Sequence, residues 1–137
     1  MINQNPEQIA RDNIDKQLVA CGWLIQDKKR LNLAAGIGIA VREYSTEVGP
    51  ADYVLFVNQK PVGVIEAKRE EEGVKFSVHE SQVEEYANAK LKLIDNLPLP
   101  FLYLSTGAIT KFTDTRDPNP RYREVFTFHR PETLSKW

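Results

Sequence analysis

The sequence is poor in the residues that build disulfides and zinc sites, with one cysteine, Cys21, and two histidines among 137 residues. A lone cysteine excludes an internal disulfide and any zinc site that needs several cysteine ligands. Neither His79 nor His129 has a further metal-binding residue at a ligand spacing, and no histidine stands where it would pair with the cysteine. We therefore expect Cys21 to be a buried helix residue and neither histidine to bind a metal.

The sequence also lacks long apolar runs and an excess of charge of one sign. No apolar stretch approaches the ~20 residues that span a bilayer, and the polar beginning MINQNPEQIARDN is unlike a signal peptide. A cytoplasmic protein is the default expectation. The net charge is −1, whereas autonomous nucleic-acid binders tend to be strongly basic. Any contact with DNA is therefore expected to be local, or helped by a partner.

The pattern of apolar residues predicts one domain, spanning residues 1–137, of the α/β class. Helical spacing predicts helices over 4–21 and 76–95. Strands are predicted over 37–43, 52–57, 62–68 and 101–106, with further short strands near 109–112 and 125–129. We interpret 26–33 and 44–51 as connections. The predicted core is therefore αβββαβ, a mixed sheet flanked by helices.

Two connections in this pattern predict how the strands pair. The strands over 52–57 and 62–68 are joined by Asn58-Gln59-Lys60-Pro61, which predicts an antiparallel hairpin. The passage from 62–68 through the second helix to 101–106 predicts a parallel pair with a right-handed crossover.

The hairpin carries charged residues at both of its open ends: Asp52 begins one strand, and Glu66, Ala67 and Lys68 end the other. A turn centred near Gln59 pairs residues whose numbers add to about 118, so Asp52 and Glu66 are predicted to lie opposite each other. Alternation along the strand predicts Lys68 on the same face, with the Ala67 carbonyl between the two charged side chains.

Two carboxylates this close repel unless they share a proton or a cation. Oxygen ligands suit Mg²⁺, which takes one or two carboxylates and keeps several waters. A lysine beside such an ion can orient water or stabilise charge on a phosphate. This arrangement therefore favours metal-assisted hydrolysis of a phosphodiester. The alternative is a solvent-exposed ion pair at the end of a strand, which contributes little.

Three further groups of residues complete the candidate set. Gln82 and Tyr86 lie one turn apart on the second predicted helix, where they would reach DNA or simply pack at the edge of the core. Lys28-Lys29-Arg30 is a basic run that is either a solvated loop or a contact for phosphates. The acidic run 70–72 is expected to face away from any bound DNA.

Together, Asp52, Glu66-Ala67-Lys68 and Gln82-x-x-x-Tyr86 resemble the PD-(D/E)xK nuclease core with the Q-x-x-x-Y extension of RecB-like nucleases. The closer resemblance is to the N-terminal nuclease domain of the R subunit of type I restriction enzymes. It rests on ADYVLFVNQKPVGVIEAKRE, on FTFHRPETL, and on a Glu-x-x-x-Arg pair followed by IDKQLVACGW. The sequence departs from that family at LSTG, where an asparagine often precedes the glycine.

This resemblance implies a three-layer restriction-endonuclease-like fold and an Mg²⁺-dependent endonuclease acting on double-stranded DNA. It implies that Asp52 and Glu66 bind the metal with the Ala67 carbonyl, and that Lys68 is the catalytic lysine. Gln82 and Tyr86 would support DNA binding or nuclease activity. Glu7 would add a carboxylate; its alternative role is to complement the dipole of the first helix.

The resemblance also implies partners and a longer protein. Methyltransferase and specificity subunits would complete a restriction complex and select the DNA sequence. A helicase-like motor that uses ATP would follow this domain, and no G-x-x-x-x-G-K-[ST] motif for ATP is present in the 137 residues. We therefore expect a fragment of a larger R subunit.

Two alternatives remain at this point. The chain could be a free-standing repair or junction-resolving nuclease, for which a closed C-terminus and a dimer with two sites would argue. It could also be a non-catalytic module of the same fold that holds DNA or docks a subunit, for which a failure to bind Mg²⁺ would argue.

Overall fold

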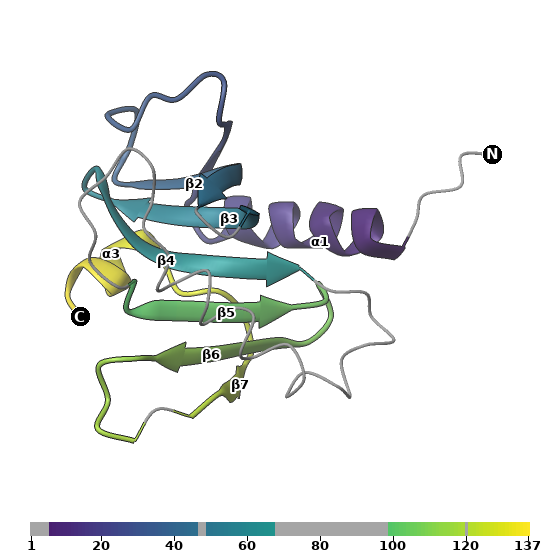
Figure 1. Cartoon of the computed structure of the whole chain (residues 1–137), viewed down its shortest axis with the longest axis vertical. Helices are drawn as coiled ribbons and strands as arrows, with labels where there is room; N and C mark the ends of the chain where they lie inside the picture. Colours follow the sequence, from purple (N-terminus) through teal and green to yellow (C-terminus); the bar gives the residue numbers. More distant parts are fainter. Residues whose placement is uncertain (1–5, 47–48, 68–98, 120) are drawn as a thin grey trace.

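A computed structural model describes residues 6–46, 49–67, 99–119 and 121–137 of the chain (Figure 1). These residues form one mixed sheet of seven strands and two helices, so the predicted α/β class is confirmed. The helices are α1 (Pro6–Ala20) and α3 (Pro131–Ser135). The strands are β1 (Leu24–Asp27), β2 (Gly38–Thr46), β3 (Gly49–Val57), β4 (Lys60–Ala67), β5 (Phe101–Ser105), β6 (Thr110–Asp114) and β7 (Arg123–Val125). The helix predicted over 76–95 lies outside the described residues.

Helix α1 follows the signals in its sequence at both ends. It begins at Pro6, whose fixed φ suits a first helical position. It ends before Gly22, whose φ of +95° is a left-handed conformation that glycine adopts at little cost. Ile14 and Leu18 are fully buried, whereas Ile9 of the same helix is 45% exposed. None of the helices described is long and apolar enough to cross a membrane.

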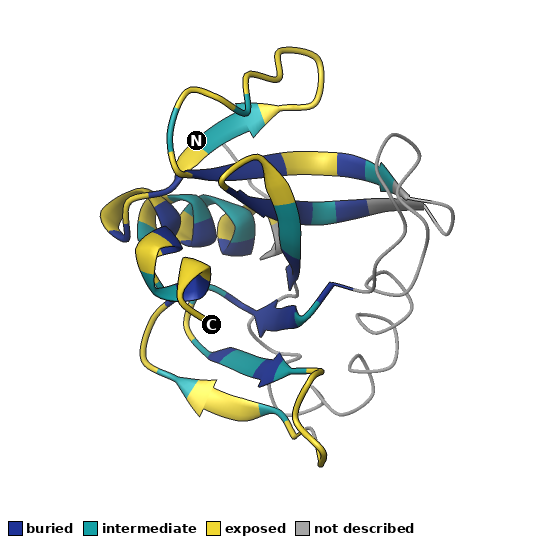
Figure 2. Cartoon of the chain, turned by 90° about the vertical axis from the view of Figure 1, so that its left-hand side faces the viewer, coloured by how far each residue is buried: buried dark blue, intermediate teal, exposed yellow. Residues whose placement is uncertain are grey.

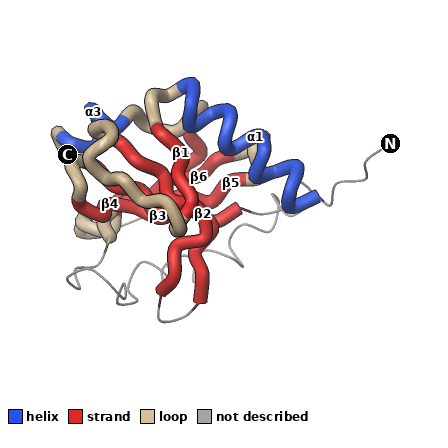
Figure 3. Tube along the Cα trace, turned by 90° about the horizontal axis from the view of Figure 1, so that it is seen from above, coloured by secondary structure: helices blue, strands red, loops and turns tan. Residues whose placement is uncertain are grey.

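The strands lie in the sheet in the order of the sequence, β1 to β7. Neighbouring strands are antiparallel except for β1 with β2 and β4 with β5, which are parallel. The parallel pairing of β4 with β5, predicted from the β-α-β passage, is confirmed. Helices α1 and α3 lie on the same face of this sheet (Figure 3).

Three parts of the sheet differ from the sequence prediction. We interpreted residues from 26 onward as a polar connection, but β1 ends only at Asp27. The predicted loop over 44–51 is largely strand, because β2 and β3 continue to pair up to Thr46 and Gly49. The last strand, predicted near 125–129, is β7, which ends at Val125. In each case the strand is held by pairing with a neighbour and lacks a clean apolar alternation, so its sequence gives a weak signal.

The central strands of the sheet consist mostly of buried residues (Figure 2). Their apolar side chains form two clusters. One cluster packs beneath α1 and α3 and includes Trp23, Tyr103 and Phe128. Cys21 is buried in it, as predicted. Trp23 donates its indole N–H to the His129 carbonyl at 2.9 Å, which ties the C-terminal segment to this cluster. The opposite face carries a second cluster, formed by Ile39, Val41, Tyr44, Ala51, Val54, Phe56, Val64, Leu99, Leu102 and Leu104.

Candidate functional site

The pairing of β3 with β4 brings Asp52 and Glu66 to the same level of the sheet. Tyr53 lies opposite Ile65 and Val54 opposite Val64, so the next pair toward the open end of the hairpin is Asp52 and Glu66. The predicted register is therefore confirmed. Closer to the turn, the pairing shifts by one residue between Leu55 and Phe56.

The turn is shorter than the predicted connection Asn58-Gln59-Lys60-Pro61, because β4 already begins at Lys60. Asn58 and Gln59 both have positive φ, at 50° and 68°. Positive φ at both central residues is the signature of the two-residue hairpin turn that matches strand twist. The strands close on the pair Val57 and Lys60, and the bulge then restores the register that reaches the carboxylates.

Both carboxylates are largely removed from solvent. Glu66 is 6% exposed, and the side chain of Asp52 is 11% exposed. Glu66 and Ala67 also pair with Leu104 and Ser105 of β5, so this level lies at the carboxyl ends of two parallel strands. Carboxylates removed from water in this way need hydrogen bonds or cations to offset the loss of hydration.

Asp52 receives both kinds of partner. One carboxylate oxygen accepts the backbone N–H of Ala67 at 2.8 Å. The other lies 2.5 Å from the Arg11 guanidinium, which reaches it from α1 and also lies 3.6 Å from Glu43. Burial lowers the pKa of Arg11, but the charge and hydrogen bond of Asp52 outweigh burial, so the net shift is upward. Arg11 is thus a cation held directly against the predicted metal ligand.

Helix α1 is fixed over this position by Tyr53, which follows Asp52 in β3. The Tyr53 hydroxyl donates to Asp15 of α1 at 2.6 Å. Burial and this hydrogen bond both raise the pKa of Tyr53, which keeps the hydroxyl protonated. The contact sets the position of α1, and therefore of Arg11, relative to Asp52.

The pleat of the sheet is interrupted beside Asp52. Glu43 has a φ of +53°, which is uncommon for a residue with a side chain. Val41 and Tyr44 are three residues apart and yet belong to one cluster, and the same is true of Ala51 and Val54. Strict alternation therefore does not hold at this level, and the placement of Asp52 and Glu66 on one face of the sheet stays a prediction. The Asp52 carboxylate is oriented by its two hydrogen bonds.

A small cavity of about 80 Å³ opens at this position. That volume is room for several water-sized groups. Its walls are Gln8, Arg11, Arg42, Glu43, Asp52 and Tyr53. The cavity gives solvent and small ions a path to the Asp52 carboxylate.

Comparison with known proteins then decides the family. The family described as type I restriction enzyme EcoKI endonuclease subunit, second domain, matches residues 26–100, more than half of the chain. The chain belongs to this family. The match includes the whole β3–β4 hairpin and ends just before β5. It confirms the resemblance drawn from the sequence motifs.

Two individual proteins support this assignment. The type I restriction enzyme EcoKI endonuclease subunit of Escherichia coli (strain K12) is 37% identical over 86 residues, covering 55% of this chain and 7% of the relative. The chain thus matches a small part of that protein. The crystal structure of the type IIG restriction endonuclease BpuSI is similar over 82% of this chain and 12% of its own, with a TM-score of 0.53 and 20% identity. That likeness shows a shared fold.

The structure describes only part of the predicted site. Asp52 and Glu66 lie at one level of the sheet and Ala67 donates its N–H to Asp52, whereas Lys68, Gln82 and Tyr86 lie outside the described residues. Glu7 lies in the first turn of α1, and its side chain is outside the description. Among the described side chains, no group of three His, Cys, Asp or Glu converges as a metal site. Their roles as metal ligands, catalytic lysine and DNA contacts stay predictions.

The sequence analysis did not identify Arg11 and Glu43 as members of the site. Arg11 stands within the Glu-x-x-x-Arg pair of the first helix, and that pair was the available signal. Glu43 gave no signal, because its role depends on a backbone conformation that the sequence does not indicate.

Proposed function

We propose that this chain is the endonuclease module of a type I restriction enzyme R subunit, and that it hydrolyses phosphodiester bonds in double-stranded DNA with Mg²⁺. One observation carries the proposal: in a chain of this family, two largely buried carboxylates lie at one level of the sheet, at the end of the β3–β4 hairpin. An ion pair that serves only structure at the end of a strand is ordinarily exposed to solvent. Both of these carboxylates are largely buried.

The residues at this level fit a magnesium ion. Asp52 and Glu66 are hard oxygen ligands, and two carboxylates are the number that Mg²⁺ takes while keeping its waters. Asp52 already binds a positive group, the guanidinium of Arg11, at 2.5 Å. When bound, the metal would lower the pKa of water and neutralise charge on the phosphate.

The residues of the chain would then act as follows. Asp52 and Glu66 hold the cation with the Ala67 carbonyl, and the Ala67 N–H keeps the Asp52 carboxylate in its orientation. Lys68 is proposed as the catalytic lysine, which orients the attacking water or stabilises charge on the phosphate. Gln82 and Tyr86 are proposed to contact DNA, and Glu7 to add a carboxylate; these roles rest on the sequence motif.

The wider setting is also a proposal. We infer a cytoplasmic restriction complex in which methyltransferase and specificity subunits select the DNA and an ATP-dependent motor belongs to the same R subunit. A free-standing repair nuclease would need the same carboxylates but would act without these partners. A docking module of the same fold would not need two buried carboxylates at one level, which favours the catalytic proposal.

A plasmid-nicking assay tests the proposal. At low ionic strength, chosen because the net charge is −1, the 137-residue chain should nick supercoiled DNA only with Mg²⁺ present. Asp52→Asn and Glu66→Gln should each lower the rate by at least about 100-fold, since supporting partners of metal ligands alone are worth 10–100-fold. Asp117→Asn, an acid in the β6–β7 connection, is the matched control. Nicking that survives Asp52→Asn would disprove the assigned site.

A further inference from the structure

The turn that follows β1 presents three consecutive cations. Strand β1 ends at Asp27, and the Arg30 N–H closes a turn on the Asp27 carbonyl at 3.0 Å. Lys28, Lys29 and Arg30, which we call the basic turn, are all exposed. A tight turn places three like charges on neighbouring residues at the surface, where they favour the binding of an anion.

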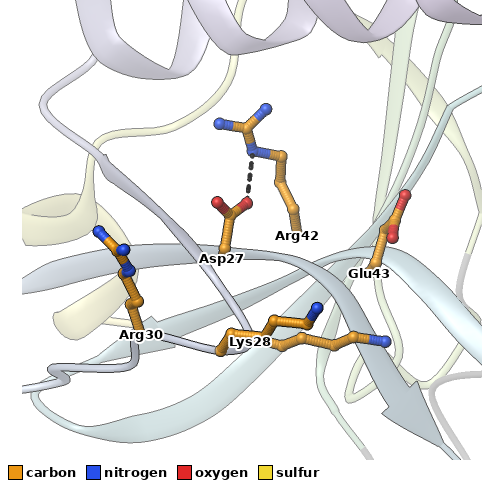
Figure 4. Close-up of a pocket in the computed structure, with 6 residues that line it drawn as sticks. Asp27, Lys28, Arg30, Arg42 and Glu43 are labelled. Carbon is orange, nitrogen blue, oxygen red and sulfur yellow. Dashed lines mark ion pairs between the residues drawn. The ribbon is translucent and has the colours of Figure 1, made fainter.

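The basic turn lines a cavity of about 470 Å³ (Figure 4). Arg42 and Glu43 of β2 form the other side of that cavity, opposite the turn. The same two residues also line the small cavity that contains Asp52. The basic turn and the candidate metal site are therefore neighbours at the same end of the strands.

The ion pairs around this cavity leave the charge of the basic turn uncompensated. Arg42 lies 3.4 Å from Asp15 and 3.7 Å from Asp27, so its charge is already matched (Figure 4). Glu43 lies 3.6 Å from Arg11. Within the part of the chain that the structure describes, no ion pair involves Lys28, Lys29 or Arg30. The six residues that line the cavity, Asp27, Lys28, Lys29, Arg30, Arg42 and Glu43, are four cations and two carboxylates. They carry a net charge of +2 in a chain whose net charge is −1.

The spacing of the sheet suits a phosphate backbone. Strand β1 lies two strands from β3, which at roughly 4.8 Å per strand is about 10 Å. One DNA strand advances about 3.4 Å per nucleotide, so this separation corresponds to roughly three nucleotides along the axis. A duplex with one phosphate at Asp52 and Glu66 would place phosphates a few nucleotides away over the basic turn.

We propose that the basic turn, Lys28, Lys29 and Arg30, binds the phosphate backbone of duplex DNA next to the bond that is cut. This inference rests on the proposed function and adds the surface that holds the substrate. It also explains how a chain without an overall positive charge can engage a polyanion, since the attraction is confined to one edge of the sheet.

Fluorescence anisotropy with a short labelled duplex tests this proposal. The 137-residue chain is titrated in EDTA at several salt concentrations between about 50 and 200 mM, because each phosphate neutralised contributes about 0.9 to the salt slope of binding. The triple variant Lys28→Gln, Lys29→Gln, Arg30→Gln should bind at least about tenfold more weakly at low salt. Its slope should fall by up to about 2.7, for three lost contacts.

The matched control removes three exposed cations near the opposite end of the strands: Lys60→Gln, Arg130→Gln and Lys136→Gln. Lys60 lies at the hairpin turn, and Pro131, at the start of α3, lies against Gly38 at the beginning of β2. The control changes net charge by the same amount and should retain the affinity and slope of wild type. Circular dichroism confirms that both variants fold.

Three results would overturn the inference in distinguishable ways. Equal weakening in both triple variants would show a general effect of charge. Unchanged binding in the basic-turn variant, with normal wild-type binding, would refute the surface and leave the proposed nuclease intact. If wild type binds no duplex at the lowest salt, the surface is refuted, and the nicking assay then judges the proposed function separately.

Discussion

Arg11 is the residue on which the charge balance of the candidate site depends. It lies 2.5 Å from Asp52 and 3.6 Å from Glu43, and it comes from a helix that the Tyr53–Asp15 hydrogen bond holds in place. A guanidinium against a carboxylate occupies one of the oxygen lone pairs that a metal would use. Metal binding at Asp52 therefore has to compete with Arg11.

Arg11→Met tests this competition, because methionine keeps much of the apolar stem and removes the charge. We expect Mg²⁺ to bind about two- to fivefold more tightly, since a partly exposed ion pair contributes at most ~1 kcal/mol. The free energy of unfolding in EDTA should fall by a similar amount, because Asp52 loses its cation. Calorimetry and urea denaturation measure the two effects, which run in opposite directions.

Arg42→Met is the control for this prediction. Arg42 lines the same cavity but pairs with Asp15 and Asp27, so its removal should leave Mg²⁺ affinity close to that of wild type. A folded Arg11→Met protein that binds Mg²⁺ no better than wild type would show that Arg11 serves only stability.

At the scale of elements, β4 carries one of the carboxylates and lies between β3 and β5. Its central residue Gly63 lies so close to β5 that an added Cβ would come 2.7 Å from the Phe101 carbonyl oxygen. Such contact with backbone cannot be relieved by a rotamer change. The close approach keeps the carboxyl ends of β4 and β5, with Glu66 and Ala67, at one level of the sheet.

Gly63→Ala should therefore lower the free energy of unfolding by about 1–3 kcal/mol, the usual cost of overpacking a core. Urea denaturation measures the loss. Gly36→Ala is the control: there the nearest atom, at 2.9 Å, is the flexible end of the exposed Leu24 side chain. Its effect should stay within ~0.5 kcal/mol. Equal losses in the two variants would show that the close approach of β4 to β5 is not tightly constrained.

The elements differ in how well their sequence predicts them. The sequence predicts three elements well: helix α1, the β3–β4 hairpin and β5. Burial of one side gives their apolar residues a regular spacing, and Pro6 and Gly22 mark the ends of the helix. Strand β1 could not be predicted in this way, because it is an edge strand with two partly exposed central residues. The predicted register at Asp52 and Glu66 holds because the bulge between Leu55 and Phe56 offsets the two-residue turn. The Arg11–Asp52 contact joins residues far apart in sequence and needs the packed structure.

At the scale of the whole molecule, His129 links stability to pH. It lies beside Tyr103, whose hydroxyl is 2.7 Å from the imidazole Nδ1. Burial lowers the pKa of His129 below its ordinary 6.5, and burial raises the pKa of Tyr103. A protonated phenol next to a neutral imidazole donates the hydrogen bond, so the folded state favours uncharged His129.

Acidification should therefore destabilise the fold through His129. Below pH 6.5 the unfolded chain takes up a proton at this histidine before the folded chain does, so its contribution is present above that pH and is lost as the pH falls. Between about pH 7.5 and 5.5, the melting temperature of wild type should fall more steeply with decreasing pH than that of His129→Phe. If the melting temperatures of the two proteins fall in parallel, His129 is not the source of the pH dependence.

We propose that the end of the sheet holding Asp52 and Glu66 binds the divalent cation of a nuclease. Calorimetric titration of Mg²⁺ at low salt, into wild type and into Asp52→Asn shown to be folded by circular dichroism, tests it most directly. We expect saturable binding in wild type that is lost in the variant. Identical heats in the two proteins, or no binding even with a short DNA duplex present, would contradict it.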